Sequence, residues 1–299
     1  MNKIKVEFCP VCDETEFDNF VECTDFYASQ EKYSLQKCKN CGFIFTQFFP
    51  SESEIGRYYE VQEYVSHSDS RRGIVNFIYH FARSYMLRRK VALVEKVSGI
   101  TSGKLLDYGC GTAYFLNAVS ENGWSAIGIE KSAKARNLAT SMFKLDVYDP
   151  SGINHLEANS YDVITLWHVM EHIENLNEML DRFYALLKPG GTLVVAVPNN
   201  KSYDAQYYGE YWAAYDVPRH LWHFDTSTVK ALMNRRGFSF KTLEAMPLDA
   251  FYISMLSERY KQSSFSFVKG LLVGFFAFIA TLKDKNNSSS IIYVLKKTK

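Results

Sequence analysis

The sequence predicts an α/β protein with a doubly wound, mostly parallel sheet and a small metal-binding ribbon in front of it. Three observations predict this fold. Strand and helix patterns alternate from Lys104 to Val197, the turn after the first of these strands is rich in glycine, and two Cys-x-x-Cys pairs lie in the first fifth of the chain. Such alternation favours parallel strands joined by helices, whereas paired cysteines favour a separate small module.

The N-terminal module is expected to span residues 1–50 and contains Cys9-Pro-Val-Cys12 and Cys38-Lys-Asn-Cys41. Four thiolates in two short turns can surround one tetrahedral zinc ion, and Gly42 suits the tight turn after the second pair. Because four cysteines leave no open position, this zinc is predicted to be structural and to stabilise a ribbon too small to fold by burial alone. A redox Cys-x-x-Cys is the rival interpretation, but it expects one such motif rather than a matched pair.

The next region, residues 51–98, is expected to connect the module to the larger domain. Residues 51–75 are polar, and from Asn76 to Ser98 apolar residues recur with roughly helical spacing. This pattern indicates a linker followed by one long amphipathic helix.

The larger domain, residues 99–299, is predicted to contain alternating elements. Strands are expected at Lys104–Tyr108, Trp124–Glu130, Phe143–Tyr148, Tyr161–Trp167 and Gly191–Val197. Helices are expected at Thr112–Asn122, Ser132–Met142 and Asn175–Leu187, the last ended by the turn Lys188-Pro189-Gly190-Gly191.

A strongly apolar stretch, residues 266–282, lies within a helical insertion expected near residues 250–285 and is interrupted only by Lys269. It is shorter than the roughly 20 residues that a membrane-spanning helix needs, so a buried or interfacial helix is favoured. Such a helix could attach the protein to a membrane surface, join two copies or cap a pocket.

The balance of charged residues bears on whether the protein binds nucleic acid. The chain has 299 residues with 34 basic and 33 acidic side chains, a formal net charge of +1. This balance argues against a broad nucleic-acid-binding face, which usually shows a clear basic excess. Six cysteines without a secretory segment are typical of thiols or metal ligands, so a cytoplasmic protein is expected.

The first strand-to-helix turn reads Asp107-Tyr108-Gly109-Cys110-Gly111. Glycines let the backbone approach a ligand closely, and the following helix offers free N–H groups. Glu130 ends the second strand, 23 residues after Asp107, where a carboxylate can accept hydrogen bonds from both hydroxyls of a ribose. At this point a nicotinamide-binding enzyme remains open.

Taken together with later segments, this turn resembles the first motif of the class I S-adenosylmethionine-dependent methyltransferases, an acid followed by G-x-G-x-G. Leu186-Leu187-Lys188-Pro189-Gly190-Gly191 is similar to the turn before the family's fifth strand, and Val195-Ala196-Val197-Pro198-Asn199 to that strand. The resemblance covers residues 100–245 and implies a Rossmann-like fold. The sequence departs from the family at Ala113, where a third glycine would lie.

The resemblance implies roles for individual residues. Asp107, Gly109 and Gly111 would hold the methionine end of the cofactor, and Glu130 the ribose. Asp149, after the third strand, would bind the adenine amino group, with Asp146 as the alternative. His168, at the exit of the fourth strand, would line the pocket.

His168-Val-Met-Glu171-His172 also spells H-x-x-E-H, a pattern used by one class of zinc proteases. That interpretation is rejected because the protease motif lies within a long helix, whereas this one straddles a strand-to-helix exit. Some quinone-related O-methyltransferases place acidic residues and a histidine here, which implies a second metal site at Glu171 and His172. Capping and packing are the simpler explanation.

A second cluster, residues 211–224, is rich in aromatic residues and histidine and resembles the H-L-x-x-F stretch of methyltransferases acting on sugars, quinones and other small molecules. His220 is predicted to be the general base, because histidine side chains titrate near neutral pH, and His223 is the reserve candidate. Asp216 and Arg219 could orient a polar acceptor.

The sequence therefore predicts an enzyme that moves a methyl group from S-adenosylmethionine to oxygen or carbon of a small molecule, such as a sugar, quinone or lipid-linked acceptor. One alternative is an RNA or DNA methyltransferase with the ribbon as reader, against which stand the balanced charge and the lack of an N/D-P-P-Y/F signature. The other alternative is a non-catalytic protein that binds the cofactor.

Overall fold

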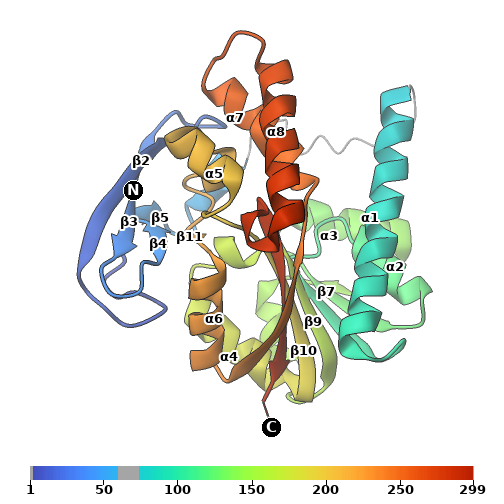
Figure 1. The fold of residues 1–299 in the computed structure, drawn as a ribbon. Helices are drawn as coiled ribbons and strands as arrows, with labels where there is room; N and C mark the ends of the chain where they lie inside the picture. The colour runs from blue at the N-terminus through green and yellow to red at the C-terminus, as the bar shows by residue number, and fades with distance from the viewer. Residues whose placement is uncertain (1–2, 60–73, 299) are drawn as a thin grey trace.

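The computed structural model describes residues 3–59 and 74–298, and its elements are shown in Figure 1. Most of the expected polar linker lies outside the described residues. Helix α1 (Ile74–Ser98) follows it and confirms the long helix expected before the larger domain.

The central sheet has seven strands in the order β12-β13-β10-β9-β6-β7-β8. They are β6 (Lys104–Tyr108), β7 (Ser125–Ile129), β8 (Val147–Tyr148), β9 (Tyr161–Trp167), β10 (Leu187–Pro198), β12 (Phe238–Ala245) and β13 (Ser290–Lys297). Strands β6 to β10 pair in parallel, and β13 runs antiparallel to both of its neighbours, β10 and β12. The mostly parallel α/β fold predicted from the sequence is therefore confirmed.

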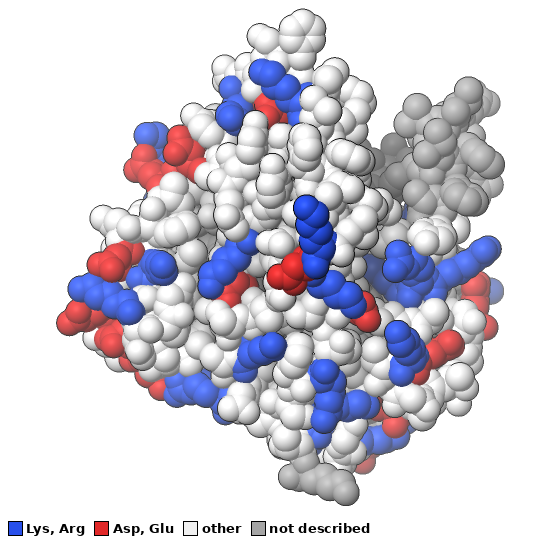
Figure 2. Space-filling view, in the orientation of Figure 1, with Lys and Arg blue, Asp and Glu red and all other residues white. Residues whose placement is uncertain are grey.

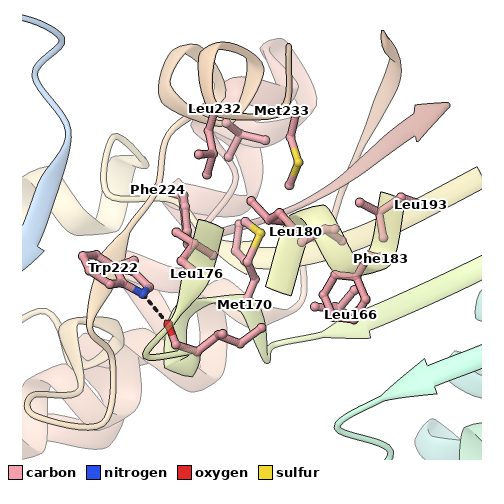
Figure 3. Close-up of a cluster of buried hydrophobic side chains, with 14 of the residues drawn as sticks. Leu166, Met170, Leu176, Leu180, Phe183, Leu193, Trp222, Phe224, Leu232 and Met233 are labelled. Atoms are coloured by element: carbon pink, nitrogen blue, oxygen red, sulfur yellow. Dashed lines mark hydrogen bonds between the residues drawn. The ribbon is translucent and has the colours of Figure 1, made fainter. Parts of the chain in front are cut away.

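Helices cover both faces of this sheet, which makes it doubly wound. Neighbouring residues of one strand face different cores: Val194 packs with α1 and α2 (Tyr114–Glu121), whereas Leu193 and Val195 pack with α4 (Leu176–Leu186) and α6 (Thr226–Arg235). Figure 3 shows the core between the sheet and helices α4 and α6, where side chains of both helices contact strand residues and Trp222. Strands buried on both faces read as continuous apolar runs, which is why β9 and β10 could be recognised.

The third strand is shorter than predicted. Helix α3 (Ala133–Phe143) continues to Phe143, where the strand was expected to begin, and Lys144 ends the helix in a left-handed conformation with φ +56°. Only Val147 and Tyr148 then pair with β7. The strand runs at the sheet edge, where two residues suffice to place the turn that follows.

The N-terminal module forms a second, four-stranded sheet in the order β11-β4-β3-β2. Its strands are β2 (Phe17–Thr24), β3 (Lys32–Cys38), β4 (Ile44–Thr46) and β11 (Trp222–His223), while β1 (Lys3–Ile4) pairs with β5 (Phe49–Pro50). Because β11 belongs to the segment after β10, the larger domain supplies one strand of the module's sheet. A module boundary at residue 50 stays a prediction.

The insertion between β12 and β13 is a hairpin of two helices, α7 (Asp249–Tyr260) and α8 (Ser266–Lys283). The hairpin rises from the carboxyl-end side of the sheet in Figure 1. Helix α8 contains the apolar stretch singled out in the sequence, and the chain returns from it to β13 through a short turn, η7 (Lys285–Asn287).

Candidate active site

The glycine-rich turn after β6 lies directly against the exit of β9. Gly109 has φ +76°, and a Cβ atom there would lie 2.3 Å from Cγ2 of Val169, so only glycine fits. Gly111 has φ +55° and faces open space. The backbone of this turn can therefore touch a ligand without hindrance.

Glu130 is held beside this turn by backbone amides. Its Oε2 accepts a hydrogen bond from the N–H of Gly111 at 2.9 Å, and its Oε1 accepts one from the N–H of Ser132 at 2.7 Å. The carboxylate is half-buried at the end of β7. This position suits a carboxylate that accepts hydrogen bonds from ribose hydroxyls, the role predicted from the sequence.

Asp107 is buried within the sheet, and its Oδ1 accepts a hydrogen bond from the hydroxyl of Thr165 on β9 at 2.6 Å. Burial raises the pKa of Asp107 to about 7, although the hydrogen bond from Thr165 and the charge of Lys90 oppose this shift. A direct contact between this carboxyl group and the cofactor stays a prediction.

The structure distinguishes the two aspartates considered for adenine. Asp149 follows β8, at the carboxyl ends of the parallel strands, where the glycine-rich turn also lies. Asp146 precedes β8, at the opposite end of the strand. The Asp149 carboxylate caps the turn η3 (Pro150–His155) by accepting hydrogen bonds from the N–H and hydroxyl of Ser151, at 2.8 and 2.5 Å. Its position therefore favours Asp149 over Asp146.

His168 leaves β9 in a left-handed conformation, with φ +57°, and its ring lies between two carboxylates. Nδ1 is 3.5 Å from Oε1 of Glu171, and Nε2 is 3.5 Å from Oδ2 of Asp249 at the start of α7. Burial would lower the pKa of His168, but hydrogen bonds and charge attraction from Asp249 and Glu171 raise it to about 9. The two carboxylates therefore favour the protonated imidazole at the exit of β9.

Glu171 is the centre of the polar cluster at this exit. It is fully buried in the turn η4 (Met170–His172), and apart from the ion pair with His168 its oxygens have no hydrogen-bond partner among the described residues. Ligand atoms of Glu171, His172 and His220 lie within 4.8 Å of one another. Burying a carboxylate is costly unless it is paired, so the ion pair with His168 contributes to holding Glu171 here, and the carboxylate can also accept from a further donor or bind a cation.

His172 and His220 meet edge to face, with ring centroids 4.6 Å apart. Nδ1 of His172 lies 2.9 Å from the carbonyl oxygen of Arg219 and 3.1 Å from the hydroxyl of Tyr59. Burial and the charge of His220 lower the pKa of His172 to about 4, so this ring is neutral at neutral pH.

The segment that carries His220 is fastened to the exit of β9. The indole N–H of Trp222 donates to the carbonyl oxygen of Ile173 at 2.6 Å, shown as a dashed line in Figure 3, and the N–H of Leu221 donates to the carbonyl oxygen of Glu171 at 2.8 Å. Nδ1 of His220 lies 2.8 Å from the carbonyl oxygen of Ala214. Because only a protonated Nδ1 can make that bond, Nε2 is the nitrogen that has the lone pair in the neutral ring.

Arg219 and His223, two neighbours of His220 for which the sequence suggested roles in the reaction, make other contacts in the structure. Arg219 was expected to orient an acceptor, but it is 2% exposed and its guanidinium binds Asp216 at 2.7 and 3.0 Å, Asp25 at 3.0 Å and the carbonyl oxygen of Tyr58 at 3.1 Å. That expectation is wrong, because no guanidinium face is left for a substrate. His223 is buried in β11 with Nε2 3.0 Å from the hydroxyl of Thr46, and burial lowers its pKa well below the ordinary value. The structure does not support it as the reserve base.

The four predicted zinc ligands converge. The Sγ atoms of Cys9 and Cys41, and those of Cys12 and Cys38, are 3.5 Å apart, and all four lie within 4.8 Å of one another. Zinc–sulfur bonds of about 2.3 Å place tetrahedral thiolates roughly 3.8 Å apart, so the cluster has the size for zinc. Arg235 of α6 donates to the carbonyl oxygen of Val11 at 2.8 Å. The cluster thus rests on the helical layer and is separate from the histidines.

Comparison with known proteins agrees with this geometry. Residues 79–243, more than half of the chain, match a family model described as a methyltransferase domain. The chain belongs to this methyltransferase family.

Individual relatives are distant. The ubiquinone biosynthesis O-methyltransferase of Rhodopseudomonas palustris (strain HaA2) is 25% identical over 62% of this chain and 75% of the relative. That of Vibrio atlanticus (strain LGP32) is 29% identical over 37% of this chain, and the match spans about half, 51%, of the relative. Both relatives are methyltransferases, in agreement with the family match.

Two solved structures share the fold. Phosphoethanolamine N-methyltransferase 2 of Haemonchus contortus, in complex with S-adenosylmethionine, has a TM-score of 0.50 and 19% identity and covers 71% of this chain and 53% of its own. A putative sarcosine dimethylglycine methyltransferase of Galdieria sulphuraria has a TM-score of 0.51 and 14% identity over 73% and 86%. The chain therefore has the fold of the class I S-adenosylmethionine-dependent methyltransferases, as the sequence predicted.

Proposed function

We propose that this methyltransferase transfers a methyl group to oxygen or acidic carbon of a small molecule, with His220 as the general base. The observation that carries the proposal is the position of the His220 ring. Nδ1–H is held by the carbonyl oxygen of Ala214, so Nε2 is the nitrogen that can take a proton, and the ring lies beside the buried carboxylate of Glu171.

The residues at the cofactor end fit S-adenosylmethionine. The open face at Gly111 leaves space for the methionine end, and the fixed carboxylate of Glu130 offers acceptors for the ribose. When bound, this cofactor supplies an electrophilic methyl group on a sulfonium. Val169 packs on Gly109, so the cofactor loop and the histidine cluster are neighbours, and an acceptor between them can be aligned with that methyl group.

Proton removal follows from the same geometry. With the cofactor bound to supply the methyl group, Nε2 of His220 would take the proton that the acceptor loses on methylation. The imidazolium formed is stabilised by Glu171 and by Asp216, whose Oδ2 lies 3.9 Å from Nε2. Because the cluster is largely buried, these charges interact more strongly than they would in water.

A second candidate role for the same cluster is binding of a divalent cation. Glu171, His172 and His220 offer three ligand atoms within 4.8 Å of one another, and Oε2 of Glu171, which has no hydrogen-bond partner among the described residues, supports it. A cation there would bind the acceptor oxygen directly, and His220 would then be a ligand instead of a base.

The acceptor class is supported by charge and by relatives. A net charge of +1 favours a small molecule over nucleic acid, and two distant relatives are named for ubiquinone biosynthesis. We therefore propose a hydroxylated ring, a sugar or a lipid-linked form of either. All six cysteines are free thiols in the structure, which supports a cytoplasmic location, and structural zinc is proposed for the four that converge.

The test compares His220→Ala with His155→Ala, an exposed histidine on η3 that serves as matched control. Turnover is measured on a panel of phenolic and sugar acceptors, before and after treatment with a chelator. A lost base should lower turnover by roughly 10²–10⁴-fold and leave cofactor affinity nearly intact. Turnover at the wild-type rate in His220→Ala would refute the role of His220 as the general base. Activity removed by the chelator and restored by Mg²⁺ would instead establish the cation.

A further inference from the structure

The hairpin of α7 and α8 presents a face that the rest of the described chain does not cover. Helix α8 is locked onto α7 through two glycines: a Cβ on Gly270 would lie 2.6 Å from Cα of Met255, and one on Gly274 would lie 2.8 Å from Cα of Phe251. This close packing fixes which face of α8 points inward. The opposite face is held outward and cannot rotate toward the core.

The outward face of α8 is apolar. Six of its side chains are each at least half exposed: Phe267, Val268, Leu272, Phe275, Phe276 and Leu282. The helix has a mean hydropathy of 1.6, and only 28% of its residues are buried. Figure 2 shows that the surface over the middle of α8 is uncharged, with basic side chains above and below it. Soluble proteins rarely leave such a continuous apolar patch without a partner.

The charges around this patch are mostly basic, and the exposed Asp284 at the C-terminal end of α8 is the acidic exception. Within residues 249–283 the exposed charged side chains are all basic: Arg259, Lys261, Lys269 and Lys283. The two acidic residues of the hairpin do not offset them, because Asp249 faces His168 and Glu258 is buried. An apolar helical face bordered by lysine and arginine is complementary to a bilayer that carries anionic lipids.

We propose that the outward face of α8 docks the methyltransferase onto the surface of an anionic lipid bilayer. The helix lies in the interface and does not cross it. Its inward face is packed on α7, and only seven residues after Lys283 the chain enters β13 in the central sheet. An amphipathic helix in this plane inserts its apolar side chains among the lipids while its lysines reach the headgroups.

Docking there brings the active site to the lipid surface. Helix α7 begins at Asp249, whose carboxylate lies 3.5 Å from Nε2 of His168 at the exit of β9. The same hairpin that carries the apolar patch therefore contacts the candidate active site. This step rests on the proposed function: the acceptor that such a site receives is lipid-linked or dissolved in the bilayer.

Flotation with vesicles tests the docking without any turnover. The full chain is mixed with vesicles of phosphatidylcholine, either alone or with phosphatidylglycerol. The variants are Phe275→Ser with Phe276→Ser, and Lys269→Glu with Lys283→Glu. The matched control is Leu138→Ser with Met142→Ser on α3, whose side chains are 44% and 41% exposed. Light scattering gives the oligomeric state, and calorimetry with S-adenosylmethionine shows that each variant is folded.

The wild type and the α3 control should bind the phosphatidylglycerol vesicles, and the phenylalanine variant should bind them at least about tenfold more weakly. The lysine variant should lose the preference for the anionic lipid. Equal binding by the phenylalanine variant, or no vesicle binding by the wild type, would overturn the proposal. A dimer that the phenylalanine variant loses, without vesicle binding, would show that a second copy covers the face. If vesicle binding holds but no acceptor is methylated, the proposed function fails and the docking stands.

Discussion

Replacing Glu130 with alanine should weaken the binding of S-adenosylmethionine while the fold persists. The carboxylate is fixed by the amides of Gly111 and Ser132, at 2.9 and 2.7 Å, so its remaining lone pairs point toward the space over the glycine-rich turn. Hydrogen bonds to a charged acceptor contribute about 1.5–3 kcal/mol. At about 1.4 kcal/mol per factor of ten, the dissociation constant should rise about 10- to 150-fold.

Calorimetric titration of the full chain with S-adenosylmethionine measures this effect. Glu121→Ala is the matched control, because Glu121 is an exposed acid at the end of the neighbouring α2 and accepts a hydrogen bond from the side chain of Asn117 at 2.9 Å. Glu130→Gln should fall between the wild type and Glu130→Ala, since an amide keeps one acceptor oxygen and loses the charge. Urea unfolding should show that both variants remain folded.

Unchanged affinity in Glu130→Ala would refute the assignment of this carboxylate to the ribose. Tighter binding of a nicotinamide dinucleotide than of S-adenosylmethionine would refute the assignment of the whole site.

Two further predictions concern the metal and the histidine cluster. Elemental analysis should find one zinc per chain in the wild type and almost none in Cys38→Ser with Cys41→Ser, and equal zinc in both would contradict the ribbon. Because the pKa of His168 rises from 6.5 to about 9 on folding, the folded state holds this proton more tightly. The stability gained is complete below pH 6.5 and is lost as the pH rises to about 9. The side chain is 35% exposed, so solvent screening reduces the effect to about 1 kcal/mol. Urea unfolding at pH 6.5 and at about pH 9 should show this decrease in the free energy of unfolding for the wild type and a smaller decrease for Asp249→Asn. Equal decreases in the two proteins would contradict the ion pair.

Much of the sheet could be predicted because local patterns specify it. The strand Tyr161–Trp167 was predicted with the bounds that the structure shows, since it is buried on nearly its whole length and its apolar run has clear ends. The last two strands, β12 and β13, were not predicted. The apolar run at residues 291–295 was a usable signal for β13. It was overlooked because the more strongly apolar stretch before it, residues 266–282, was interpreted as a helix.

The candidate site could be predicted only where its residues lie close together in the sequence. His168, Glu171 and His172 belong to one motif at the exit of β9, so their proximity followed from the local pattern. Asp249 gave no such signal, because it reaches His168 from a helix 81 residues later. Arg219 was misassigned for the same reason, since its partner Asp25 is 194 residues away and no local pattern links the two.

These long-range contacts also connect the N-terminal module to the chemistry. Strand β4 pairs with β11, and the hydroxyl of Thr46 on β4 donates to the carbonyl oxygen of His220 at 2.8 Å. Arg219, next to His220, binds Asp25 of the module. The cysteine cluster closes the other end of the same sheet, because Cys38 ends β3. We therefore expect a metal at these cysteines to fix the sheet against which the His220 segment is built. The proposed zinc would then act on catalysis by holding the proposed base in place rather than by touching the substrate.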